Sequence, residues 1–180
     1  MRSFASVAAT VEGVELNRFE AVLDPLPGAA PNPDTYACFQ TVPEAWAAAT
    51  KDPRPVLDVV TNYVTWLQQL PEPRMFAASP ITFDGAWIDY YLRRFTRFGL
   101  AQGPYERDVL FHGPGLCLRS YAAAITGRPV SDVSPSALPA SWFGNVRHTH
   151  RAIDDALGYT HLLGELHRRS SGTAASETSQ

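Results

Sequence analysis

The stretch from His150 to Leu166 constrains the fold most, because its apolar residues recur with the period of an α-helix. They follow one another at steps of four and three: Ala152, Ala156, Tyr159, Leu163 and Leu166. This spacing places them on one buried helix face. Asp155 lies one turn from both Ala152 and Tyr159, so we expect its carboxylate at the edge of that face. Asp154 is expected to face solvent.

A carboxylate at the edge of an apolar face is costly unless a metal ion, a cation or hydrogen bonds compensate it. His150 stands five residues before Asp155, at the predicted start of the helix. An imidazole there is suited to act as a general base. The stretch therefore predicts both the last helix, ending near Arg168, and a candidate chemical site.

The rest of the chain alternates between predicted strands and helices, which indicates an α/β fold with a partly parallel sheet. An antiparallel pair of strands is expected within residues 1–23, and short buried strands within 74–79 and 115–120. Helices are predicted at 43–49, 56–70, 83–95 and 121–126. Residues 31–36 and 130–144 are expected to be loops, the second ordered by packing of Leu138, Trp142 and Phe143.

The predicted helix at 83–95 carries Trp87, Ile88, Tyr91, Leu92 and Phe95 on one face. Asp84 falls at its first turn, directly after a predicted strand. An acidic residue is favoured there by the helix dipole alone, so a plain helix cap is an alternative to a functional role. Two carboxylates, Asp84 and Asp155, together with His150 would suit a hydrolase that uses divalent metal ions.

A chain of 180 residues fits one domain, which we place at 1–169, followed by a disordered Ser/Thr/Ala-rich tail at 170–180. The net charge of −3 gives no bulk attraction to nucleic acid. Binding to a polyanion would need a local basic patch, for which Arg93, Arg94 and Arg97 are the candidates. A solvated helix face explains the same three residues.

Cys38 and Cys117 lie in apolar surroundings without metal-ligand spacing, which predicts reduced core residues of a cytoplasmic protein. No apolar run is long enough for a membrane span, and no secretory signal is evident.

Two further groups invite functional interpretation. His148, His150 and His161 resemble zinc ligands in type but match no standard zinc spacing. Aromatic residues could stack on bases, although at helical spacing they favour the core: Trp66, Trp87, Tyr91 and Trp142. We expect all of them except Trp142 to be core residues.

The sequence H-R-A-I-D-D-A at 150–156 resembles the third motif of the DEDDh 3′–5′ exonucleases, a superfamily that includes ribonuclease T and the proofreading subunit of DNA polymerase III. Residues 76–88, which contain the pair Phe83-Asp84, look like its second motif. The segment 118–123 resembles the one that follows the second-motif helix. The resemblance covers residues 3 to about 168.

The resemblance implies a ribonuclease H-like mixed sheet flanked by helices, and removal of nucleotides from the 3′ ends of single-stranded DNA or RNA. By position, Asp84 and Asp155 would bind metal in a two-ion Mg²⁺ or Mn²⁺ site, and His150 would be the general base. Dimerisation is common among ribonuclease T-like members, so a homodimer is compatible with it.

One departure is large. The family's first motif, D-x-E on the first and central strand, supplies two more carboxylates, and no D-x-E precedes Asp84. Either the native protein carries this strand upstream of Met1, which the intact later motifs favour, or the chain is a degenerate member. The 180-residue chain is expected to have weak or no nuclease activity. Two alternatives stay open: a non-catalytic nucleic-acid-binding or interaction module with this fold, and a different metal-dependent phosphohydrolase acting on nucleotides.

Overall fold

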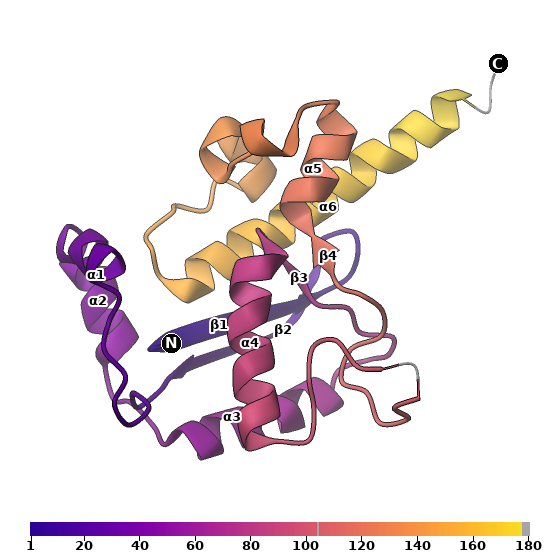
Figure 1. Ribbon diagram of the computed structural model, residues 1–180. Coiled ribbons are helices and arrows are strands. Elements are labelled where there is room, and N and C mark those ends of the chain that lie inside the picture. The colour runs from indigo at the N-terminus through magenta and orange to yellow at the C-terminus, as the bar shows by residue number, and fades with distance from the viewer. Residues whose placement is uncertain (104, 178–180) are drawn as a thin grey trace.

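The computed structural model describes residues 1–103 and 105–177, with side chains as far as residue 172. The fold is mixed α/β, as predicted (Figure 1). The strands are β1 Ser3–Ala9, β2 Glu15–Val22, β3 Ala77–Ala78 and β4 Leu116–Cys117. The helices are α1 Pro33–Gln40, α2 Pro43–Thr50, α3 Val56–Gln68, α4 Ile81–Phe95, α5 Leu118–Thr126 and α6 Ala152–Glu177. Three 3₁₀ turns, Val130–Asp132, Pro135–Ala137 and Ala140–Phe143, occupy the segment between α5 and α6.

Strands β1 and β2 form an antiparallel hairpin that lies between α3 and α6 (Figure 1). Aromatic rings attach the hairpin to α3. The ring of Tyr63 packs edge-on against Phe4 at 5.0 Å and stacks on Trp66 at 5.7 Å. Phe19 contacts the same group, 5.1 Å from Tyr63. These contacts cover one face of the hairpin with large apolar surface, which is a main source of stability in a small sheet.

Strands β3 and β4 form a second, parallel pair, with Ala77 opposite Leu116 and Ala78 opposite Cys117. The predicted strands at 74–79 and 115–120 are thus present but short. The sequence led us to expect one mixed sheet. Among the described residues the hairpin and the parallel pair are instead two separate two-stranded sheets.

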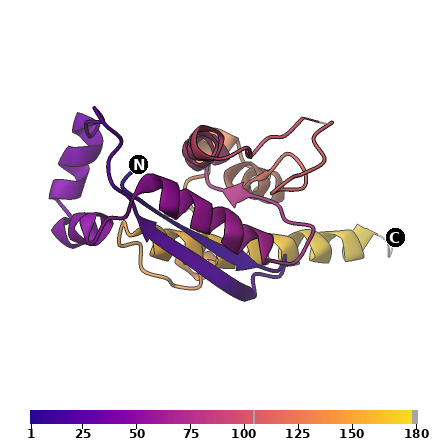
Figure 2. The ribbon, with the colours of Figure 1, turned by 90° about the horizontal axis from the view of Figure 1, so that it is seen from below.

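Two apolar clusters hold the elements together. The larger one joins the β1–β2 hairpin to α3 and α4 and includes Leu23, Val59 and Leu92, which are at most 1% exposed. The second joins α5 and the 3₁₀ turns to α6 through Leu118, Leu162 and Leu166. Figure 2 shows the hairpin beneath α3, with α6 running past it to the C-terminal end. Helix α4 contacts α3 and β3, so its first turn lies near the parallel pair.

Three predictions about local structure were wrong. A loop was expected at 31–36, but residues 33–40 form α1. Asn32 caps this helix by accepting a hydrogen bond from the Thr35 amide, and Pro33 occupies its first turn. Helix α6 continues to Glu177, past its predicted end and through most of the segment expected to be disordered. Cys38 is exposed and Cys117 half-buried, so neither is a fully buried core residue.

Helices α1 and α2 form a hairpin at one side of the molecule (Figure 1). None of the residues of α1 is buried. In the part of the chain that the structure describes, no helix is long and apolar enough to cross a membrane.

Candidate functional site

The structure brings Asp84 and Asp155 together. Asp84 lies in the first turn of α4, directly after β3 and the Ser79-Pro80 corner. Asp155 lies in the first turn of α6. Both side chains are half-buried, and the negative charge of Asp155 acts on Asp84. The first turns of two helices thus place two carboxylates where helix dipoles favour negative charge.

Burial and mutual repulsion set the proton affinities of this pair. Burial raises the pKa of Asp84 to about 6, and the nearby Asp155 charge adds to the effect. Burial also raises the pKa of Asp155, while His148 and His150 act in the opposite direction. Two carboxylates that repel one another at the edge of the core form an arrangement that a bound cation would stabilise.

His148 is the histidine in direct contact with Asp155. Its Nδ1 lies 2.7 Å from Oδ1 of Asp155. The ring of His150 packs edge-on against that of His148, with the centroids 4.4 Å apart. The sequence predicted His150 beside the carboxylates. In the structure His148 contacts Asp155, and the ring of His150 packs against that of His148. His148 was considered only as a zinc ligand, and its position two residues before His150 gave no sign of this contact.

His150 is exposed, with a backbone φ of 61°. This left-handed conformation is uncommon for a residue with a side chain, although histidine adopts it more often than most. It marks the sharp turn by which the chain enters α6. An exposed imidazole beside a carboxylate pair is accessible to a ligand from the solvent side, and such access is one requirement of a general base.

A hydrogen-bonded turn holds the two histidines in place. The Thr149 hydroxyl donates to the Asp154 carboxylate, and the Arg151 amide donates to Thr149 Oγ1 at 3.3 Å. Asp154 was expected to face solvent with no role. It is instead half-buried and bonded to the residue between the two histidines. Asp154 is therefore a positioning residue for the turn.

Tyr159 joins the two halves of the site. Its hydroxyl donates to the Ser79 carbonyl at 3.4 Å, which links α6 to the corner that precedes α4. Burial raises the pKa of Tyr159 to about 12, with further contributions from Asp155 and Asp84. The sequence indicated Tyr159 only as a member of the apolar face. Its spacing of four residues from Asp155 was the available signal that the two share one side of the helix.

The carboxylate pair offers oxygen ligands of the type that a hard divalent cation takes. Mg²⁺ and Mn²⁺ prefer oxygen ligands, and Mg²⁺ is commonly held by one or two carboxylates with water and substrate phosphate completing its shell. Asp84 and Asp155 would be the protein ligands. No cluster of three or more histidine, cysteine or acidic side chains suited to a metal occurs within the described part of the chain. A second ion would therefore need ligands beyond this pair.

The three histidines considered as a zinc site do not gather. His148 and His150 are neighbours, but His161 packs against Gly144 in a different hollow lined by Glu12 and Trp142. That hollow has a volume of about 600 Å³.

The aromatic and basic candidates also differ from expectation. Trp87 was expected in the core and is 42% exposed, whereas Trp142, the expected exception, is 9% exposed. Arg93 pairs with Asp89, with Nε 2.9 Å from Oδ2, and Arg97 pairs with Asp108. Two of the three arginines of the predicted basic cluster thus already have acidic partners.

No family model matches the chain, and no curated protein or solved structure shows significant similarity to it.

Proposed function

We propose that this protein acts on nucleic acid as a metal-dependent 3′–5′ exonuclease of the DEDDh type. One observation carries the proposal: Asp84 and Asp155, from the two segments that resemble the second and third motifs of that superfamily, lie together beside a histidine pair. The resemblance implies that these two residues share a site, and their proximity in the structure supports that expectation. The proposal includes the ribonuclease H-like fold that the resemblance implies.

In this proposal the carboxylates hold a divalent cation that would polarise a phosphodiester and its attacking water. Asp84 and Asp155 would hold the ion, and its positive charge would offset the cost of keeping these two half-buried carboxylates ionised. His150, exposed at the mouth of the site, accepts the proton of the attacking water. His148 holds Asp155 by its 2.7 Å contact and keeps the carboxylate oriented.

Substrate and assembly follow the resemblance. The proposed substrate is the 3′ end of single-stranded DNA or RNA, and a homodimer and a cytoplasmic location belong to the same proposal. The described residues supply two of the four carboxylates that the superfamily uses. We therefore expect slow turnover from this chain and treat metal binding as the more sensitive readout.

The test combines both readouts. Mn²⁺ binding is followed by electron paramagnetic resonance, and 5′-labelled single-stranded DNA and RNA are incubated with Mn²⁺. Asp155→Asn is compared with the wild type, and Asp34→Asn, an exposed aspartate in the first turn of α1, serves as the matched control. The proposal requires loss of Mn²⁺ binding and of 3′-end shortening in Asp155→Asn only.

A second candidate function is a nucleic-acid-binding module that keeps the fold without catalysis. The specific observation in its favour is that, among the described residues, no group of three or more metal-ligating side chains gathers around the Asp84–Asp155 pair. Oligonucleotide binding by the wild type, without product in Mn²⁺ and without a difference between wild type and Asp155→Asn, would support this candidate. An oligonucleotide blocked at its 3′ end tests for a general phosphohydrolase. Such an enzyme would still hydrolyse it, whereas the exonuclease and the binding module would not.

A further inference from the structure

Helix α4 presents an aromatic stripe to solvent that the proposed chemistry does not use. Phe83 is 63% exposed, Trp87 42% and Tyr90 45%. These residues follow one another at steps of four and three, so they share one face of the helix. The residues of α4 that are buried occupy a different face: Gly85, Ile88, Tyr91 and Leu92.

The aromatic stripe extends from the carboxylate site to an arginine near the C-terminal end of α4. It begins at Phe83, the neighbour of Asp84, and leads away from the carboxylate pair toward the C-terminal end of α4. Arg94 stands one turn beyond Tyr90, with its guanidinium carbon 5.8 Å from the centre of the Tyr90 ring. From residue 83 to residue 94 the helix rises about 16 Å, a length that can accommodate a few nucleotides.

Arg94 differs from its two neighbours in charge pairing. Arg93 and Arg97 are bridged by Asp89 and Asp108. Over the ranges 1–103 and 105–172, where side chains are described, no carboxylate bridges Arg94. Its charge is therefore available to a ligand.

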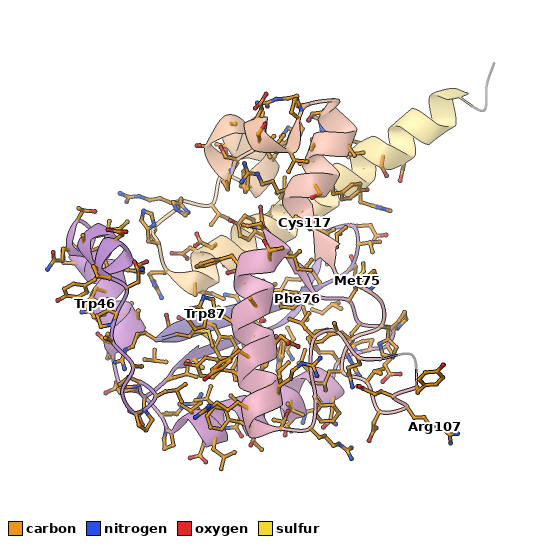
Figure 3. All side chains as sticks on the ribbon, viewed as in Figure 1. Trp46, Met75, Phe76, Trp87, Arg107 and Cys117 are labelled. Carbon is orange, nitrogen blue, oxygen red and sulfur yellow. The ribbon has the colours of Figure 1, made fainter. Side chains whose placement is uncertain are left out.

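Aromatic rings on a surface, followed by an unbridged cation, match the chemistry of a single nucleic-acid strand. Bases stack on the rings and phosphates pair with the arginine. A base-paired duplex hides its base faces and cannot use the stripe in this way. Figure 3 shows Trp87 on the side of α4 that faces the α1–α2 hairpin, which carries Trp46. Arg107 lies at the opposite side of the molecule.

We propose that Phe83, Trp87, Tyr90 and Arg94 form a binding surface for single-stranded nucleic acid that leads to the carboxylate pair. The inference rests on the proposed function for the class of ligand. The new element is the stripe, which would bind the nucleotides that precede the 3′ end of the strand.

The test measures binding without turnover. Fluorescence anisotropy of 5′-fluorescein-labelled dT12 and U12 is recorded in EDTA, so that failure of metal chemistry does not affect it. Trp87→Ala should weaken binding about tenfold, since one base loses the ring on which it stacks. Trp87→Phe should restore most of the affinity. Tyr105→Ala, at a tyrosine that is 94% exposed in another part of the molecule, should have no effect.

Two further comparisons separate stacking from charge. An abasic dodecamer, which loses stacking on all three rings, should bind the wild type at least as weakly as dT12 binds Trp87→Ala. Arg94→Gln should lower the salt dependence of binding by about one phosphate contact. Arg107→Gln makes the same change of charge at an exposed arginine away from the stripe and should not lower it.

Unchanged dT12 affinity in Trp87→Ala, or equal binding of the abasic strand by the wild type, would overturn the inference. So would wild-type protein that binds neither oligonucleotide. If the wild type sediments as a dimer, Trp87→Ala dissociates it and oligonucleotide affinity is intact, the stripe is a self-association surface instead.

The binding surface and the exonuclease proposal can fail separately. If the wild type binds Mn²⁺ but the stripe variants have no effect on oligonucleotide affinity, the binding surface alone is rejected. If the stripe variants weaken oligonucleotide binding but the wild type neither binds Mn²⁺ nor shortens 3′ ends, the exonuclease proposal alone is rejected.

Discussion

The carboxylate of Asp155 in α6 acts on the carboxylate of Asp84 in α4, although the two residues belong to distant segments of the chain. Like charges in a half-buried position are uncommon without a compensating group, because repulsion and desolvation act together. His148 partly compensates Asp155, and the hydrogen bond from Tyr159 to the Ser79 carbonyl holds the two helices together at this point. The pair should therefore govern how stability responds to pH and to metal ions.

The first prediction concerns pH in EDTA. The pKa of Asp84 is about 6 in the folded protein and near 3.8 in the unfolded chain, so the folded state binds this proton more tightly. Its contribution to stability is complete below about pH 4 and is lost as the pH rises through 6. The loss should be about 1–2 kcal/mol once solvent screening of the partly exposed carboxylate is considered.

Urea unfolding of wild type and Asp84→Asn between pH 4 and 7.5 measures this contribution. Two neighbouring groups interact with Asp84 electrostatically: Asp155 and Tyr159. The difference between the two proteins removes contributions that they share. Identical pH profiles would contradict the prediction. Mn²⁺ at pH 7.5 should raise the unfolding temperature of the wild type more than that of Asp84→Asn.

The second prediction separates the two histidines. His148→Ala removes the 2.7 Å contact with Asp155 and should raise the Asp155 pKa further. His150→Ala should raise the Asp155 pKa less, because His150 acts on Asp155 electrostatically without the direct hydrogen bond that His148 makes. Carbon-detected NMR titration of the Asp155 carboxyl group gives both values. If the exonuclease proposal is right, turnover should fall in His150→Ala while Mn²⁺ affinity stays nearly constant. A larger pKa change in His150→Ala than in His148→Ala would reverse the assignment.

The sequence predicted elements best where one strong pattern spans a whole segment. The apolar period of 56–70 identified α3, and the spacing of residues 152–166 identified most of α6. It failed at 33–40, where the helix depends on a local cap by Asn32 rather than on an apolar face. The β1–β2 pairing was predictable from neighbouring strands, but the separation into two sheets depends on contacts between segments far apart in the chain.

The candidate site shows the same limit. Asp84 and Asp155 were predictable one at a time from their place at helix starts, and the resemblance suggested that they meet. His148 contacts Asp155 across the turn that contains the left-handed residue His150, and local spacing does not encode that turn. Trp87 was misassigned because the apolar face of α4 is broad. Ile88, Tyr91 and Leu92 occupy the core side, and Trp87 projects beyond it.

The third prediction concerns Arg74, which is 9% exposed. Its guanidinium donates to the carbonyls of Leu110 and Leu70 at 3.0 and 2.9 Å and to Glu72 at 2.9 Å. Lysine cannot reach three acceptors in this fork geometry, so Arg74→Lys should leave a buried carbonyl unsatisfied and cost about 2 kcal/mol. Arg97→Lys, at a side chain that is 70% exposed, should change the free energy of unfolding by less than about 0.5 kcal/mol. Equal urea midpoints for the two variants would contradict this role of Arg74.

The last prediction compares two glycines of α6. A Cβ on Gly164 would lie 2.2 Å from the Glu12 carbonyl oxygen, because the β1–β2 turn at Gly13 rests directly on the helix. Gly164→Ala must displace backbone and should destabilise the protein by about 3 kcal/mol. A Cβ on Gly158 would meet only the Phe143 ring at 3.6 Å, an ordinary contact. Gly158→Ala should therefore stabilise the helix by up to about 1 kcal/mol. Urea unfolding of both variants gives the signs, and the same sign for both would mean that the turn does not rest on α6 as closely as the structure places it.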